Sequence, residues 1–189
     1  MTDGDAFAGQ RLFVAIALAG DTRAALAVAA DMLAAAGVRA RRVPCENYHA
    51  TVAFLGAVSG ERLDPIAARL RDAAAHCGAF ALPVDRIGGF PNDARARVVW
   101  AGTSTPSPLF AALCAGVRAR LTPLGFAFAQ DAAFHVTLFR AKQPQRIPAV
   151  APPPAVCMSV DALTLFASHG GARGVRYVAL ETFALAQLR

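Results

Sequence analysis

The sequence predicts an α+β fold, and three observations carry this prediction. The chain has 189 residues, close to the ~100–200 residues typical of one domain. Hydrophobic residues make up 56% and charged residues 17%, which provides for a buried core and excludes a largely disordered chain. Helical and strand patterns are interspersed without the regular strand–helix alternation that builds a parallel α/β sheet.

The first half of the chain is expected to contain two helices among several strands. Asp21 and Thr22 can cap a helix that ends at Gly37, and apolar residues at helical spacing predict a second helix over 63–77. Apolar runs and alternation predict strands at 11–18, 38–43, 49–55 and 80–84. Gly56 is expected to end the third of these strands.

Segments rich in glycine and proline punctuate the second half. The segment at 88–93 is expected to be a loop, and residues 143–154, with five prolines in twelve residues, an extended connection. Ser107 and Pro108 open a helix. Its apolar face is expected to comprise Leu109, Leu113, Val117 and Leu121. Strands are expected at 97–101, 126–129 and 134–139, and a hairpin at 156–167 and 175–184 around Gly170 and Gly171.

The chain is basic, and its positive charge is almost entirely arginine. Nineteen basic residues against thirteen acidic ones give a net charge of +6, and only Lys142 is lysine. The planar fork of donors on arginine suits phosphate oxygens, so the charge favours an anionic or nucleic-acid partner. A basic surface without any partner is the alternative that charge alone leaves open.

Cysteine spacing and hydropathy indicate the compartment in which the protein is expected. No two of the four cysteines lie close together, which argues against a zinc knuckle and a disulfide framework. We expect each to be a small buried residue in a reducing compartment. No run approaches the ~18 apolar residues of a membrane span, and the acidic N-terminus is unlike a signal peptide. The expected location is the cytoplasm, away from membranes.

The pattern His-x-Thr-apolar occurs twice, at 49–52 and at 135–138. Both copies lie in segments expected to be strands. Residues i and i+2 of a strand face the same way, so each histidine projects together with its threonine. Two similar halves packed about an approximate twofold axis would bring both pairs to one cleft.

Such a cleft would hold two imidazoles and two hydroxyls. A neutral imidazole can take a proton from water while an imidazolium protonates a leaving oxygen. The hydroxyls can donate hydrogen bonds to phosphate oxygens where charge develops. In-line displacement at phosphorus needs such groups on opposite sides of one phosphorus atom. The pattern therefore indicates metal-free opening of a phosphodiester.

Simpler interpretations compete with this one. A single strand histidine is more often a core residue than a catalyst, and it is the repetition that favours function. Spacing leaves open a metal site made of His49, His135, Cys45 and Cys157, but no clustered ligand motif supports it. Ser168 and His169 lack the G-x-S-x-G context of a hydrolase nucleophile, and His169 is expected to lie in a loop.

With these residues in view, the chain resembles the 2H phosphoesterase superfamily. Within it, the chain is most similar to the bacterial and archaeal RNA 2′,3′-cyclic phosphodiesterases, once called 2′-5′ RNA ligases. The resemblance extends from about residue 11 to residue 185. Its most specific landmark is Glu-Asn-Tyr-His-Ala-Thr-Val-Ala-Phe-Leu-Gly at 46–56, and the second is His-Val-Thr-Leu-Phe-Arg at 135–140.

The resemblance implies a bilobal fold, with two pseudo-symmetric lobes of antiparallel sheet, helices packed outside and an active-site cleft between them. Residues 1–189 would form a single bilobal domain with one motif per lobe. The implied reaction is hydrolysis of a 2′,3′-cyclic phosphate at an RNA end to a 2′-phosphomonoester. The implied partners are RNA or nucleotides with such an end, and we expect a monomer with no cofactor or metal.

The resemblance also implies roles for individual residues. His49 would be the general acid that protonates the departing 3′ oxygen, and His135 the base that activates water. Thr51 and Thr137 would hold phosphate oxygens. Arg140 matches an arginine implicated in phosphate contact, yet strand alternation places it opposite in parity to His135. It should therefore face away unless the strand twists or bulges.

Other functions share these motifs. The substrate could instead be another cyclic or 2′-5′ linked nucleotide, and weak joining of RNA ends is the reverse of the same chemistry. A module that grips RNA ends without turnover is a further alternative, but binding alone does not require two proton-transfer groups. Four aromatic residues that could stack on a base are expected to be mostly core: Phe13, Phe54, Trp100 and Phe139.

Overall fold

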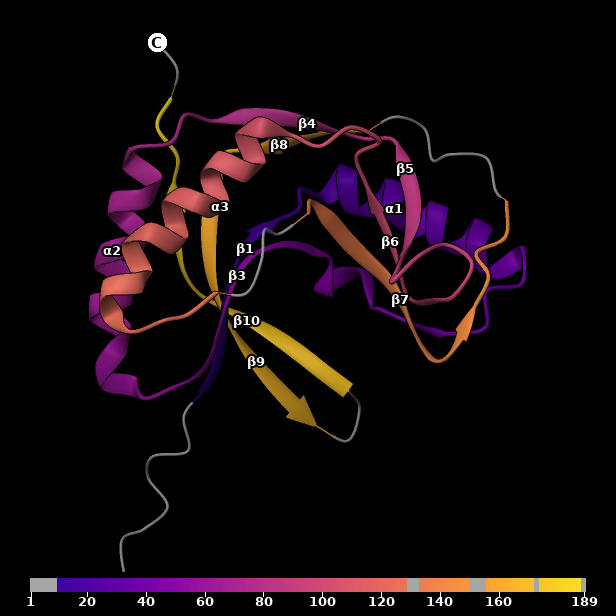
Figure 1. The fold of residues 1–189 in the computed structure, drawn as a ribbon, viewed down its shortest axis with the longest axis horizontal. Coiled ribbons are helices and arrows are strands. Elements are labelled where there is room, and N and C mark those ends of the chain that lie inside the picture. Colours follow the sequence, from indigo (N-terminus) through magenta and orange to yellow (C-terminus); the bar gives the residue numbers. More distant parts are fainter. Residues whose placement is uncertain (1–9, 129–132, 150–155, 172–173, 188–189) are drawn as a thin grey trace, which may run out of the picture.

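The computed structural model describes residues 10–128, 133–149, 156–171 and 174–187 (Figure 1). The helices are α1 (Gly20–Ala35), α2 (Leu63–Ala75) and α3 (Pro108–Leu121). A large sheet contains β1 (Gln10–Ala17), β2 (Arg41–Arg42), β3 (His49–Val58), β5 (Arg86–Phe90), β6 (Ala96–Gly102), β7 (His135–Gln145), β9 (Ala162–Gly171) and β10 (Gly174–Ala184). A small second sheet contains β4 (Phe80–Val84) and β8 (Val156–Val160).

All strand pairs in both sheets are antiparallel. The large sheet runs in the order β10-β9-β1-β3-β7-β6-β5, with β2 paired to β7. The α+β prediction is confirmed, because antiparallel sheet and helices occur without βαβ crossovers between neighbouring parallel strands. Within the described ranges, no helix is long and apolar enough to cross a bilayer.

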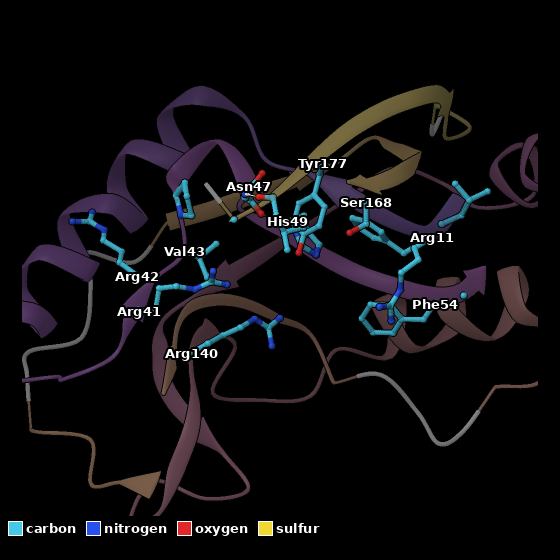
Figure 2. Close-up of a pocket in the computed structure, with 16 residues that line it drawn as sticks. Arg11, Arg41, Arg42, Val43, Asn47, His49, Phe54, Arg140, Ser168 and Tyr177 are labelled. Carbon is cyan, nitrogen blue, oxygen red and sulfur yellow. Dashed lines mark hydrogen bonds between the residues drawn. The ribbon is translucent and has the colours of Figure 1, made fainter. Parts of the chain in front are cut away.

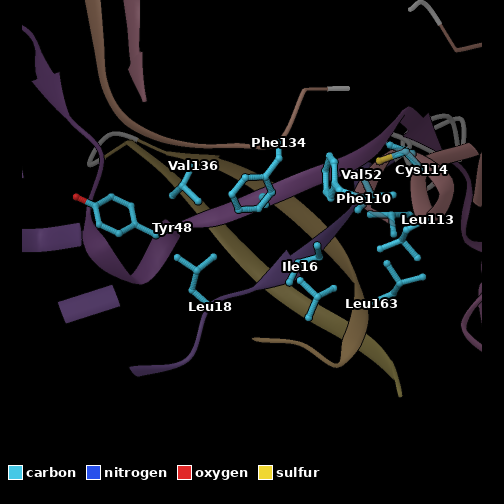
Figure 3. Packing of buried hydrophobic residues seen from close by; sticks show 14 of the residues in the cluster. Ile16, Leu18, Tyr48, Val52, Phe110, Leu113, Cys114, Phe134, Val136 and Leu163 are labelled. Carbon is cyan, nitrogen blue, oxygen red and sulfur yellow. The ribbon is translucent and has the colours of Figure 1, made fainter. Parts of the chain in front are cut away.

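The helices cover the two ends of the large sheet separately. Helices α2 and α3 pack against each other and against β3, β9 and β10, whereas α1 packs against β7 and β8 (Figure 1). Large apolar side chains fill these layers. Phe110 of α3 is one of the buried side chains drawn in Figure 3, and it meets Phe134 edge-on, with 5.3 Å between ring centroids. The buried side chains of both ends belong to one continuous apolar core.

The two ends of the sheet join where β3 pairs with β7. Ala50 of β3 lies opposite Val136 of β7, and both are fully buried. In a strand the residues on either side of a buried position face the other surface of the sheet. Because these are the central residues of the two His-x-Thr motifs, the fold brings the repeated motif together at its midline.

Several sequence-based boundaries were wrong at turns. Helix α1 is preceded by Ala19, which makes no side-chain cap. Asp21 and Thr22 lie inside its first turn, where Thr22 donates its N–H to Asp21 Oδ1 at 2.6 Å. Strand β3 continues past Gly56 to Val58, because Gly56 adopts φ +74° at a bulge instead of ending the strand.

Other differences concern which segments pair. The expected strand at 38–43 shrinks to β2, and residues 126–128 form no strand, while residue 129 lies outside the described residues. The expected strand at 156–167 divides into β8, which pairs with β4, and β9, which forms the predicted hairpin with β10. β7 extends to Gln145, and residues 150–155 of the expected extended connection are not among those described.

The glycine-rich segment expected as a loop is partly a strand. β5 includes Gly88 and Gly89. The Trp100 ring packs directly on the bare backbone of Gly88, and a Cβ at Gly89 would collide with Ala96 and Ile147. In α3, Ser107 caps the helix as predicted, accepting the Phe110 N–H at 3.2 Å. Leu109 is 55% exposed, so the buried face is formed by the other three predicted leucine and valine positions together with Phe110 and Cys114.

Replacing Gly88 with alanine should destabilise the protein by about 1–3 kcal/mol. Gly88 lies opposite Trp100 in the β5–β6 pair, and a Cβ at Gly88 would lie 2.4 Å from the indole. Trp100 is the one tryptophan of the chain, so its fluorescence through a urea titration reports on this contact.

Gly116 in α3 supplies the matched control for that titration. A Cβ there meets no atom closer than 3.8 Å, so Gly116→Ala should be neutral or stabilising by up to about 1 kcal/mol. An unchanged urea midpoint for Gly88→Ala would contradict the close packing of Trp100 on β5.

Candidate functional site

Both His-x-Thr motifs contain a β-bulge at the same position. In β3 the register against β1 skips Val52, and in β7 the register against β6 skips Leu138. A bulge puts one extra residue into its strand, so the side chains beyond it change faces. The two motifs have the same sequence of buried and exposed positions over six residues from each histidine. They are therefore alike in backbone as well as in residue type.

Phe54 and Arg140 occupy equivalent positions, five residues after each histidine. Strict alternation would turn both side chains away from the histidines, and the exception allowed for Arg140, a bulge in its strand, is present. Both side chains are exposed and line the same cavity as His49. The bulges at Val52 and Leu138 are the physical reason, because each shifts the alternation by one residue.

The β3–β7 pairing sets the four motif side chains side by side. Ala50 and Val136 are register partners. Continuing this antiparallel register by one residue on each side places His49 opposite Thr137, and Thr51 opposite His135. The two histidines are then diagonal neighbours, for which the expected separation is about 7–8 Å. That spacing leaves room for one phosphate group hydrogen-bonded from both sides.

Main-chain carbonyls orient both imidazoles in the same way. Nδ1 of His49 lies 2.7 Å from the Asn47 carbonyl oxygen, and Nδ1 of His135 lies 2.8 Å from the Ala133 carbonyl oxygen. A carbonyl only accepts, so Nδ1 carries the proton and donates it in each case. Nε2 of each ring is thereby left as the nitrogen that can accept or release a proton.

Each imidazole also contacts an aromatic ring edge-on. Tyr177 of β10 lies 5.0 Å from His49, and Phe90 of β5 lies 4.9 Å from His135, measured between ring centroids. Phe13 of β1 adds a tilted contact to His49 at 4.9 Å. These rings restrict the orientation of both histidines and withdraw them partly from water.

The surroundings favour neutral histidines in the free protein. Burial lowers the pKa of His49 and of His135 below the ordinary histidine value, because the charged imidazolium loses hydration. The hydrogen bond to the main-chain carbonyl opposes this effect in both cases. The positive charge of Arg140 lowers both pKa values further, and His135 adds to the effect at His49.

Replacing Arg140 with glutamine should raise the pKa of both imidazoles, because a positive charge that disfavours each imidazolium is removed. The measurement is an NMR titration of the Cε1–H resonances. Arg140→Lys keeps the charge and should leave both pKa values low. Arg69→Gln removes an exposed arginine of α2 and should change neither. A fall in either pKa in Arg140→Gln would contradict this electrostatic assignment.

A cavity of about 610 Å³ opens beside His49. Sixteen residues line it, four of them arginines and none of them aspartate or glutamate (Figure 2). Of the predicted site residues, His49 and Arg140 belong to this lining. Thr51, His135 and Thr137 do not, and they reach His49 through the strand pairing. The predicted residues therefore form one neighbourhood, with the open cavity on the His49 side.

The other candidate residues fall elsewhere. Phe13, Trp100 and Phe139 are buried as expected, whereas Phe54 is 70% exposed. His169 was expected in a loop but lies in β9, where its side chain is exposed and outside the cavity. Among the residues described, no group of three or more histidine, cysteine or acidic side chains is arranged to hold a metal ion.

Sequence reasoning missed several residues of the cavity wall. Arg11 and Arg41 line it, as do Ser168 and Tyr177 from the β9–β10 hairpin. The arginine-rich composition signalled a basic site but could not say which arginines formed it. Tyr177 lies in the C-terminal part of the resemblance, and only the pairing of β9 with β1 brings its hairpin to His49.

Known proteins match the chain along most of its length. The family model described as LigT like Phosphoesterase matches residues 16–100. An Archaeoglobus fulgidus protein named RNA 2′,3′-cyclic phosphodiesterase is 34% identical over 134 residues, covering 70% of this chain and 73% of that protein. This chain belongs to the LigT-like phosphoesterase family. An Escherichia coli protein named RNA 2′,3′-cyclic phosphodiesterase is 34% identical over 155 residues, covering 78% of this chain and 81% of that protein.

Solved structures extend the match to the second motif. Escherichia coli LigT in its apo form superimposes on this LigT-like phosphoesterase with a TM-score of 0.79 and 28% identity, covering 95% of this chain and 99% of that one. Escherichia coli LigT complexed with 3′-AMP gives 0.77 and 30% over the same coverage. The residues at 135–138 lie beyond the family-model match, so these whole-chain superpositions tie them to the family fold.

Proposed function

We propose that this LigT-like phosphoesterase hydrolyses the 2′,3′-cyclic phosphate at an RNA end to a 2′-phosphomonoester, without a metal ion. The observation that carries the proposal is the pairing of β3 with β7. It sets two imidazoles with matching backbone, hydrogen bonds and aromatic contacts diagonally across one strand pair. Relatives at 34% identity bear the name RNA 2′,3′-cyclic phosphodiesterase.

In the proposed reaction, the oxygen of water attacks phosphorus while the phosphorus–O3′ bond breaks. Nε2 of His135 accepts the proton of the attacking water, and Nε2–H of His49 gives its proton to the departing O3′. The products are a 2′-phosphomonoester and a 3′-hydroxyl. His49 is left neutral and His135 protonated, and proton exchange with solvent restores both. In-line geometry requires the acid and the base on opposite sides of phosphorus.

The remaining predicted residues would bind the phosphate. The hydroxyls of Thr51 and Thr137 lie on the imidazole face and can donate to the non-bridging oxygens. The guanidinium of Arg140, turned to this face by the bulge, offers further donors to the same anion. A bound phosphate would also favour the imidazolium form of His49, which burial and Arg140 disfavour in the free protein.

Turnover of adenosine 2′,3′-cyclic phosphate tests the proposal. Chromatography should show adenosine 2′-phosphate as the product, with no 3′-phosphate, and the rate should be unchanged by EDTA. Formation of the 3′-phosphate would contradict the assigned bond cleavage. Binding without turnover would favour a module that binds RNA ends. Turnover only of other cyclic or 2′-5′ linked nucleotides would show that the substrate is one of these instead.

A further inference from the structure

The cavity extends from His49 in two directions. Toward one end its wall includes Phe54 and Arg11, and toward the other it includes Arg41 and Arg140 (Figure 2). At the end that contains Arg41 and Arg140, only Arg140 has a role in the proposed hydrolysis. Its residues come from β2, from β7 and from the start of β10, segments that are far apart in the sequence.

Two arginines face each other across the strand pair at this end. Arg41 of β2 is the register partner of Arg140 of β7, and both line the cavity. Like charges directly opposite each other in a sheet are destabilising. Within the described part of the chain, no carboxylate lies within ion-pair distance of either guanidinium. An arrangement of this kind is stabilised when an anion binds between or beside the two groups.

The neighbouring Arg42, in contrast, has partners for its positive charge within the protein. Its guanidinium pairs with the Asp31 carboxylate and donates to the Ala27 carbonyl oxygen at 2.8 Å. Among the residues that the structure describes, Arg41 has no carboxylate partner. Its Nη1 lies next to Gly174, which also lines the cavity, and would be 3.6 Å from a Cβ at that position. Adjacent arginines of one strand thus differ, one being used in the fold and the other left for a ligand.

We propose that Arg41 binds the phosphate on the 5′ side of the terminal nucleotide, so that the enzyme distinguishes the ends of nucleotide chains from free cyclic mononucleotides. This inference rests on the proposed function. A 2′,3′-cyclic phosphate ends its chain, so the neighbouring phosphate lies only on the 5′ side. The imidazoles and Arg140 would hold the reacting phosphate. The next phosphate of the RNA would then lie nearest to the guanidinium of Arg41, which is beside Arg140.

Product-like ligands isolate this contact without turnover. Adenosine 2′,5′-bisphosphate differs from adenosine 2′-phosphate only by the 5′-phosphate. Calorimetric titration should show the bisphosphate binding about tenfold more tightly to the wild-type protein, as expected for a charge-assisted arginine–phosphate contact. In Arg41→Gln this preference should fall to about twofold or less, while Arg41→Lys should retain part of it.

Arg69→Gln is the matched control, since it removes one exposed arginine from α2, outside the cavity, and should keep the full preference. Equal affinities of the wild-type protein for the two ligands would overturn the inference. So would a preference that survives in Arg41→Gln, or a loss of affinity for both ligands by the same factor, which would place Arg41 on the reacting phosphate.

Kinetics extends the test to chains. The ratio of kcat/KM for a dinucleotide with a 2′,3′-cyclic end to that for adenosine 2′,3′-cyclic phosphate should be about tenfold in the wild-type enzyme, and Arg41→Gln should bring it close to one. The ratio cancels effects on the chemical step that both substrates share. If neither substrate is hydrolysed, the proposed function is contradicted. If both are hydrolysed with equal kcat/KM by the wild-type enzyme, only the role of Arg41 is contradicted.

Discussion

Replacing His49 or His135 with alanine should lower kcat/KM for adenosine 2′,3′-cyclic phosphate by about 10²–10⁴-fold, the usual range for losing a positioned general acid or base. Both imidazoles are held by main-chain carbonyls through Nδ1, so removing one should leave the other in place. The double variant should lose less than the product of the two single losses, because the groups act in one transition state.

His169→Ala is the control for these variants. His169 is exposed on β9 and lies outside the cavity, so its replacement should leave kcat/KM within about twofold. Thermal unfolding of each variant checks that the fold is retained. Near-normal turnover by both single histidine variants would remove the basis for the two-histidine mechanism.

The repeated motif made the centre of the site predictable. His49 and His135 each precede a threonine by two residues, and the period of two in a strand puts each pair on one face whatever the strand packs against. From the likeness of the two motifs we predict that both histidine–threonine pairs meet at one cleft. In the structure the two motifs lie on neighbouring strands, with Ala50 of β3 opposite Val136 of β7. Strand periodicity and the repeat were sufficient to predict this part of the site, because the relation of each histidine to its threonine spans only three residues.

The orientation of Arg140 and Phe54 could not be predicted in this way. A bulge is defined by the partner strand, and the residues that β1 and β6 set against β3 and β7 are distant in the sequence. A count of alternating positions within one strand therefore gives the wrong face after Val52 and Leu138. The signal that could have revealed the error is the pair of adjacent apolar residues in each motif, 52–53 and 138–139, which breaks strict alternation.

The basic cavity wall also depends on long-range pairing. β2 consists of two arginines and has no apolar alternation from which a strand could be predicted. Its pairing with β7 nevertheless brings Arg41 beside Arg140. The β9–β10 hairpin reaches His49 through the pairing of β9 with β1. Composition predicted a basic partner site, and the sheet order decided which arginines compose it.

A sulfur atom in place of the bridging 3′ oxygen should restore much of the activity that His49→Ala loses. A thiol has a pKa of about 8.5, far below that of an alcohol, so a thiolate departs without a proton from the enzyme. The rate for the 3′-sulfur cyclic substrate relative to the oxygen substrate should therefore be about 10²-fold higher in His49→Ala than in the wild-type enzyme. Rapid-quench kinetics with both substrates gives this ratio.

His135→Ala provides the contrast that makes the assignment of acid and base decisive. The base acts on water, whose activation is the same for both substrates, so the sulfur-to-oxygen ratio in His135→Ala should match that of the wild-type enzyme. The near symmetry of the two sites, with Nδ1 bonded to a carbonyl and an aromatic edge at each ring, leaves the roles to be set by how the substrate lies. A raised ratio in His135→Ala instead would exchange the roles, and an unchanged ratio in both variants would show that neither histidine protonates the leaving group.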